Sequence, residues 1–69
     1  MYICIGTRRI NVDQIQTYSF EQKAGVIIIF FTNESLMRFD GKEYDLDILI
    51  LELDQVCNPK VLKGKLDEK

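Results

Sequence analysis

The segment Val26–Thr32 constrains the fold of this chain more than any other feature. It holds six consecutive apolar residues before Thr32, and the polar residues 33–35 follow at once. A strand with one face in water would alternate apolar and polar side chains, whereas this run is apolar in both phases of a two-residue period. We therefore expect a strand that is covered on both faces. Its side chains should divide into two sets, Val26, Ile28 and Phe30 on one side and Ile27, Ile29 and Phe31 on the other.

The chain is short for a strand of this kind. It has 69 residues, and a domain of that size buries only about 60 per cent of its unfolded surface, so oligomerisation often adds the missing stability. One helix can cover only one face of a sheet. We therefore expect a second copy of the chain, in a symmetric dimer, to cover the other face. The alternative is a monomer in which Ile5, Val61 and Leu62 fold over that face.

Cysteine content bears on metal sites and on the compartment. The chain has two cysteines and no histidine, and no spacing typical of a zinc or calcium site, so we expect no metal and no cofactor. Cys4 and Cys57 lie in apolar stretches and are expected to be buried free thiols. The N-terminus has no charged leader, and its apolar run is too short for a membrane span. These features predict a protein of the reducing cytoplasm with no membrane partner.

Alternation of apolar side chains and turn residues predicts several short strands. We expect extended segments near residues 2–5, 8–11, 16–21, 26–32 and 35–39. The connections between them are short, which favours antiparallel neighbours. The pattern therefore predicts a four- or five-stranded antiparallel meander.

Two interpretations compete for the segment after Phe39. Asp40-Gly41 could form a hairpin turn before another strand over 42–46, or Asp40 and Glu43 could form a capping box that opens a helix. Apolar residues beyond this point recur at helical spacing and would change phase as a strand, which favours a helix over about 41–57. The fold class is then α+β, with one domain over 1–57 and a mobile basic tail over 58–69. The residues expected to lie on the sheet are Leu46, Leu49, Ile50 and Leu53.

The predicted helix carries a second apolar stripe. Tyr44, Ile48 and Leu51 recur at i, i+4 and i+7 on the side opposite the sheet. The stripe could be ordinary exposed apolar surface or a contact surface, and its coincidence with the apolar strand favours contact. The candidate interface is Ile27, Ile29, Phe31, Tyr44, Ile48 and Leu51.

Catalytic motifs are missing from the sequence. Without histidine the commonest general base is absent, and no hydroxyl or thiol has an activating partner at a recognisable spacing. Acidic residues of the predicted helix are spread around it and suit a solvated face. We therefore expect a small non-enzymatic interaction or structural module whose partner is itself or another protein.

Nucleic-acid binding is the alternative function. Three arginines could form a basic patch with the lysine-rich tail, and aromatic residues on strands could stack on bases. The net charge of −2 gives no overall attraction to nucleic acid, so we expect this role to be the weaker one. The candidate contacts are Arg8, Arg9, Arg38, Lys60, Lys63 and Lys65.

The chain resembles small bacterial proteins of the FlbD flagellar type and similar short bacterial proteins in three segments, 11–15, 26–32 and 33–39. In these proteins an Asn-x-x-x-Ile turn precedes a strand, and an apolar strand ends in a polar turn. A final strand then leads into a C-terminal helix. The resemblance implies a compact β-meander with a helix, and it transfers no catalytic residue. The family usually has glycine after the asparagine of the polar turn, where this chain has Glu34.

Overall fold

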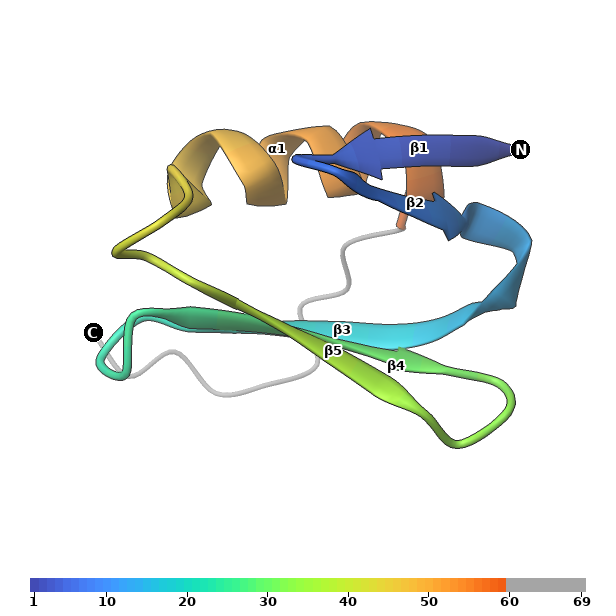
Figure 1. Cartoon of the computed structure of the whole chain (residues 1–69), viewed down its shortest axis with the longest axis horizontal. Helices are drawn as coiled ribbons and strands as arrows, with labels where there is room; N and C mark the ends of the chain where they lie inside the picture. The colour runs from blue at the N-terminus through green and yellow to red at the C-terminus, as the bar shows by residue number, and fades with distance from the viewer. Residues whose placement is uncertain (60–69) are drawn as a thin grey trace.

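The computed structural model describes residues 1–59, and it is an α+β fold of two layers (Figure 1). One layer is a three-stranded sheet of β3, β4 and β5. The other layer consists of the helix α1 and a separate hairpin of β1 and β2, which lie on the same face of the sheet. The α+β class with one C-terminal helix is thus confirmed.

The three-stranded sheet is an antiparallel meander in the order β3-β4-β5. Its strands are β3 (Ile15–Glu21), β4 (Val26–Phe31) and β5 (Leu36–Asp40). The apolar strand β4 is central, and the register sets Ile29 between Tyr18 and Met37. From Ile27 to Phe31 the burial pattern alternates as expected, with Ile27, Ile29 and Phe31 on the face that meets the helix. Val26, at the start of the strand, is also buried, with 3% of its surface exposed.

The expectation of a single meander of four or five strands is wrong. β1 (Tyr2–Ile5) pairs only with β2 (Arg8–Asn11), in a two-stranded sheet of its own. A short 3₁₀ turn, η1 (Val12–Gln14), then redirects the chain, and the Asn11 side chain accepts a hydrogen bond from the Asp13 N–H (3.1 Å). This turn lets the hairpin fold over the sheet and bury its apolar face instead of extending the sheet.

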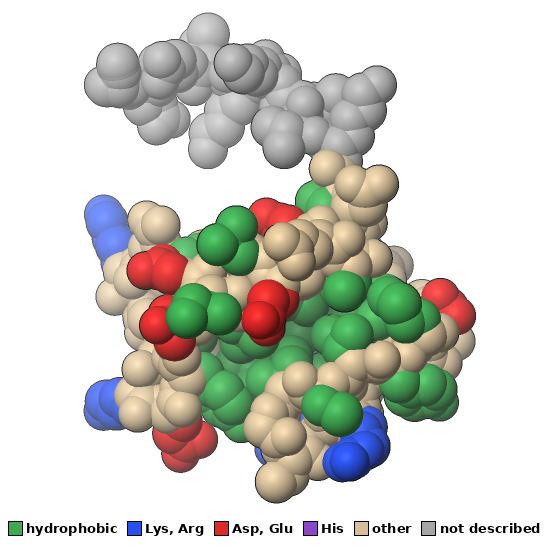
Figure 2. All heavy atoms as spheres, turned by 90° about the horizontal axis from the view of Figure 1, so that it is seen from above, with side chains coloured by type: hydrophobic (Ala, Val, Ile, Leu, Met, Phe, Trp, Pro, Cys, Tyr) green, Lys and Arg blue, Asp and Glu red, His purple; other side chains and the backbone are tan. Residues whose placement is uncertain are grey.

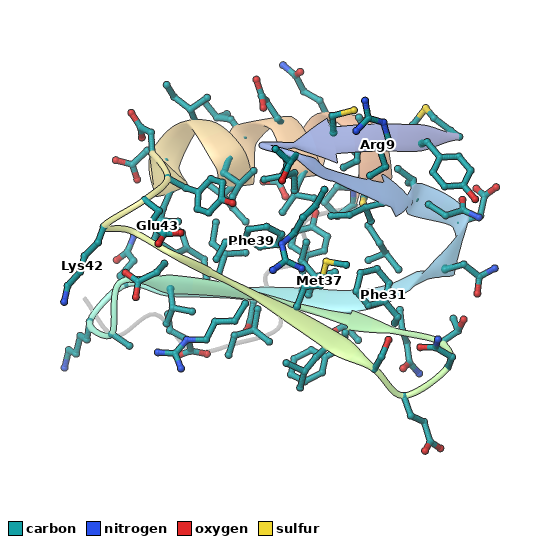
Figure 3. All side chains as sticks on the ribbon, in the orientation of Figure 1. Arg9, Phe31, Met37, Phe39, Lys42 and Glu43 are labelled. Atoms are coloured by element: carbon teal, nitrogen blue, oxygen red, sulfur yellow. The ribbon has the colours of Figure 1, made fainter. Side chains whose placement is uncertain are left out.

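The core lies between the two layers. Ile5 and Ile10 of the hairpin and Leu49 and Leu53 of the helix meet the inner face of β4 and β5. Figure 3 shows Phe31, Met37 and Phe39 directed from the sheet into this space. Leu46, Leu49 and Leu53 are buried and Ile50 is half-buried, in agreement with the expected helix face. The hairpin thus covers the part of the inner face that one helix leaves open.

Helix α1 (Leu46–Cys57) begins later than the predicted start near residue 41. Its N-cap is Asp45, whose carboxylate accepts the Ile48 N–H at 3.3 Å. Asp40 instead accepts the Lys42 N–H at 2.9 Å and closes a turn over 41–44. The predicted Asp40–Glu43 capping box is therefore wrong. The alternative strand over 42–46 is also wrong, because residues 41–44 form turns and the helix begins at Leu46.

Within residues 1–59, two residues other than glycine take left-handed backbone angles. Asn58 ends the helix with φ 50°, and its N–H donates to the Asp54 carbonyl oxygen at 2.8 Å. Glu34 has φ 72° in the turn between β4 and β5. Asn33 holds this turn by accepting hydrogen bonds from the Ser35 N–H and hydroxyl. The predicted basic tail lies almost entirely outside the described residues.

Candidate functional site

The outer face of the three-stranded sheet carries the apolar side chains that β4 directs away from the core. Ile28 and Phe30 alternate with the buried residues of that strand, and Leu36 is the register partner of Phe30 on β5. Phe30 is 37% exposed and Leu36 is 56% exposed. Both the helix and the hairpin lie on the opposite face, so no element of residues 1–59 lies on this surface. We call Ile28, Phe30 and Leu36 the outer sheet patch.

Half of the candidate interface is in the core. Ile27 and Ile29 are fully covered and Phe31 is 8% exposed, because the helix and the hairpin pack on their face of β4. These three side chains cannot line a contact surface in the folded chain. β4 does have a second apolar face, as expected, but that face is formed by Ile28 and Phe30.

Residues of the predicted helix stripe separate into two groups. Ile48 is 53% exposed and Leu51 is 62% exposed on α1. Tyr44 precedes the helix and is half-buried, with its ring edge-on to Phe39 at 5.2 Å between centroids. A methyl group added at Gly6 would lie 3.2 Å from the Tyr44 hydroxyl oxygen. Tyr44 therefore joins the hairpin turn to the core, and the stripe is reduced to two residues.

The candidate arginines lie in different layers. Arg8 and Arg9 are exposed on β2, and Figure 3 shows Arg9 directed away from the sheet. Arg38 is exposed on β5 between the inward-facing Met37 and Phe39, so it lies on the outer sheet face. The structure does not bring the three together into one basic patch. Lys60, Lys63 and Lys65 are outside the described residues.

A polar cluster that the sequence did not predict connects β3 to α1. The Tyr18 hydroxyl donates a hydrogen bond to Oδ1 of Asp54 at 2.6 Å. Burial and this bond raise the pKa of Tyr18 above its ordinary value. Burial and the Asp54 carboxylate also raise the pKa of the nearby Cys57 thiol. The i, i+3 spacing of Asp54 and Cys57 is the only sequence signal, and it does not point to β3.

The chemistry available to this cluster is limited. A thiolate is the nucleophilic form of cysteine, and a raised thiol pKa reduces its amount near neutral pH. Burial and the Asp54 carboxylate likewise favour the protonated form of Tyr18. The arrangement therefore fits a structural connection between sheet and helix better than a nucleophile and its base.

Cysteines and acidic residues form no evident metal site within residues 1–59, where no group of three potential ligands converges. Both thiols are free, but only Cys57 is partly covered. Cys4 is exposed, contrary to the prediction that both are buried, because it alternates with Ile3 and Ile5, which face the core side of the hairpin. It lies beside a hollow between β1 and α1.

Several hollows mark the surface of residues 1–59. One, of about 710 Å³, is an open depression among the turn residues after β5 and the β3–β4 loop. The second, of about 350 Å³, lies between β1 and α1 and has several apolar side chains in its lining. Figure 2 shows hydrophobic side chains between the hairpin and the helix, with acidic side chains on the helix side.

Comparison with known proteins gives no family assignment. No family model, no curated protein and no solved structure matches this chain. The length and apolar character that a membrane-crossing helix needs are found in no helix of residues 1–59.

Proposed function

We propose that this protein is a small non-enzymatic interaction module that acts as a homodimer and associates through the outer sheet patch. The observation that carries the proposal is the placement of Ile28, Phe30 and Leu36 on a sheet face that no element of the described residues covers. A contiguous exposed apolar patch is a common mark of a protein contact. A two-fold partner that presents the same surface is the commonest way to cover it.

The position of the patch supports stacking of two sheets. Phe30 and Leu36 are cross-strand neighbours, so their side chains form one continuous surface. In packed sheets the facing side chains interdigitate at a separation of about 10 Å. The same contact would supply the burial that a short chain cannot obtain from one core.

The oligomeric state tests this proposal. Sedimentation at micromolar concentration should give about twice the monomer mass for the full chain. Leu36→Glu should yield monomers, because a carboxylate placed in the contact would lose its hydration. Leu51→Glu is a matched control, since Leu51 is 62% exposed and Leu36 is 56% exposed, but the two lie on opposite layers.

The two variants also distinguish the two exposed apolar surfaces. Dissociation by Leu51→Glu alone would assign the contact to the helix and overturn the proposal for the sheet. A strictly monomeric wild-type chain across the concentration range would end the homodimer proposal altogether. Circular dichroism of each variant should show retained structure, so that loss of association is not confused with unfolding.

The non-enzymatic part of the proposal rests on side-chain chemistry. The chain has no histidine, and the raised pKa values of Tyr18 and Cys57 oppose their use as a base and a nucleophile near neutral pH. A cytoplasmic location stays a prediction from the two thiols, and the resemblance to FlbD-type proteins likewise stays a prediction.

A further inference from the structure

The hollow between β1 and α1 is a groove with one strand edge along its side. Its wider part, of about 350 Å³, runs from Ile3 to the last turns of the helix. A narrower part of about 200 Å³ continues toward Gly6 and the start of the helix. The two parts share Cys4, Ile5, Leu49 and Glu52, so they form one continuous depression along β1.

The backbone of β1 offers unused hydrogen-bonding groups to this groove. The Val12 N–H donates to the Met1 carbonyl oxygen at 2.8 Å. Hydrogen-bonded and non-hydrogen-bonded residue pairs alternate along an antiparallel ladder. The backbone groups of Ile3 and Ile5 are therefore hydrogen-bonded to β2, whereas the N–H and C=O groups of Tyr2 and Cys4 point away from β2. Within residues 1–59 these outward groups have no backbone partner. β1 therefore presents a free edge on the side where α1 lies.

Side chains around the groove define what it can bind. Its apolar lining comes from Ile3 and Ile5 on the hairpin and from Leu49, Leu53 and Val56 on the helix. On the side of α1, the helix residue Glu52 and the N-cap residue Asp45 also line the groove, while β1 contributes no charged side chain. The groove thus combines an apolar floor with an acidic rim.

We propose that this groove binds an extended peptide of alternating apolar and basic residues, which pairs with the free edge of β1 as an added strand. Alternate side chains of an added strand point to opposite faces. One set would contact the apolar floor, and the other would reach the carboxylates of the rim. Backbone hydrogen bonds to Tyr2 and Cys4 would supply affinity, as in other cases of strand addition.

A single strand suits the groove better than a second hairpin of this protein. If β1 of another copy paired with this edge, the β2 strand of that copy would extend further in the direction of α1, which forms the opposite wall of the hollow. An isolated extended segment meets no such obstacle. The inference extends the proposed interaction role to a second surface, but it does not depend on dimerisation.

The exposed Cys4 thiol gives a direct measurement on the full chain. Its rate of alkylation by iodoacetamide, followed by peptide mass spectrometry, should fall when the blocked hexapeptide (Val-Lys)₃ is added. Cys57 is the internal reference, because it is partly covered and does not line the groove. Its own rate should not change.

Matched probes and variants test the two parts of the mechanism. The hexapeptide (Val-Glu)₃ should protect Cys4 less, and (Val-Lys)₃ with N-methyl groups on alternate residues, which cannot donate those backbone hydrogen bonds, should not protect it. Glu52→Gln should weaken protection by up to about fivefold, as expected for one exposed ion pair. Asp47→Asn is the control, since Asp47 is exposed on the same helix and does not line the groove.

Three outcomes would overturn the proposal. In the first, millimolar (Val-Lys)₃ does not slow the alkylation of Cys4. In the second, the N-methylated peptide slows it as much as (Val-Lys)₃ does. In the third, the alkylation of Cys4 slows when only the protein concentration is raised. The last would place a second copy of the chain at this edge. Repeating the measurement with Leu36→Glu separates the groove from the outer sheet patch, because peptide binding should persist in that variant even if dimerisation fails.

Discussion

The Tyr18 hydroxyl donates a 2.6 Å hydrogen bond to the carboxylate of Asp54, and this contact joins β3 to the last turns of α1 across 36 residues of sequence. It ties the end of the helix to the sheet on the side where Cys57 also lies. Other contacts between the two layers are mainly apolar and non-directional. This bond therefore helps to specify how the helix lies across the sheet.

Replacement of Tyr18 by phenylalanine should lower the free energy of unfolding by about 1 kcal/mol at pH 7. Removal of a hydrogen bond to a charged group costs about 1.5–3 kcal/mol when buried, and Asp54 is exposed, which reduces the loss. Urea denaturation followed by circular dichroism measures the difference. Tyr2→Phe is the matched control, because the Tyr2 side chain is 68% exposed, and it should leave stability unchanged.

Stability should fall as the pH rises above the ordinary pKa values of tyrosine and cysteine. Folding raises the pKa of both Tyr18 and Cys57. The unfolded chain therefore releases these protons first, and the stabilisation that is complete at neutral pH is lost in alkaline solution above about pH 9–10. Denaturation curves from pH 8 to 11 should show a smaller decline for Tyr18→Phe than for wild type. Parallel curves would contradict this linkage.

Truncation of Leu53 should be among the most damaging changes. Leu53 is 1% exposed in the core between the layers, and Leu→Ala at such sites costs about 2–5 kcal/mol. Leu51→Ala removes the same atoms from a side chain that is 62% exposed. It should change the unfolding free energy of the monomer by less than about 0.5 kcal/mol. Equal effects of the two changes in urea denaturation would contradict the helix orientation.

The start of the helix can be tested with two acidic residues. Asp45→Ala should cost about 1 kcal/mol, because it removes the acceptor of the Ile48 N–H. Glu43→Ala should have almost no effect, since the Glu43 side chain does not act as a capping-box partner and its residue lies in the preceding turn. Thermal denaturation of both variants measures the contrast. A larger loss for Glu43→Ala would restore a helix that begins near residue 41.

Local patterns in the sequence predicted most elements because they depend on neighbouring residues. Alternation and turn residues located the five strands of residues 1–59, and helical spacing identified the buried face of α1. The separation of β1–β2 from the other strands was not predictable in this way. The β1–β2 hairpin could either extend the three-stranded sheet or cover the core. Which arrangement is more stable depends on tertiary packing rather than on local sequence.

The candidate site was predicted less well than the fold. The apolar run of β4 correctly indicated two apolar faces, but periodicity cannot say which of them meets the helix. Ile27 and Ile28 are adjacent residues of the same type. Only the tertiary structure makes Ile27 fully buried and places Ile28 on the outer face. Tyr44 was assigned to the helix because the capping position was placed at Asp40 rather than at Asp45.

Glu34→Gly should stabilise the protein. Glu34 takes φ 72° in the turn between β4 and β5, where a residue with a Cβ atom costs about 1–2 kcal/mol relative to a right-handed conformation. Glycine removes that strain but adds flexibility to the unfolded chain, which costs about 0.5–1 kcal/mol. The expected net gain is about 0.5–1 kcal/mol in the free energy of unfolding, measured in urea.

A matched control for this change exists at the end of the helix. Asn58 also has a left-handed backbone, with φ 50°, but asparagine tolerates that conformation better than glutamate does. Asn58→Gly should therefore change stability by less than Glu34→Gly. If Glu34→Gly instead lowered the free energy of unfolding, that result would contradict a left-handed backbone at Glu34 in the turn that Asn33 and Ser35 hold together.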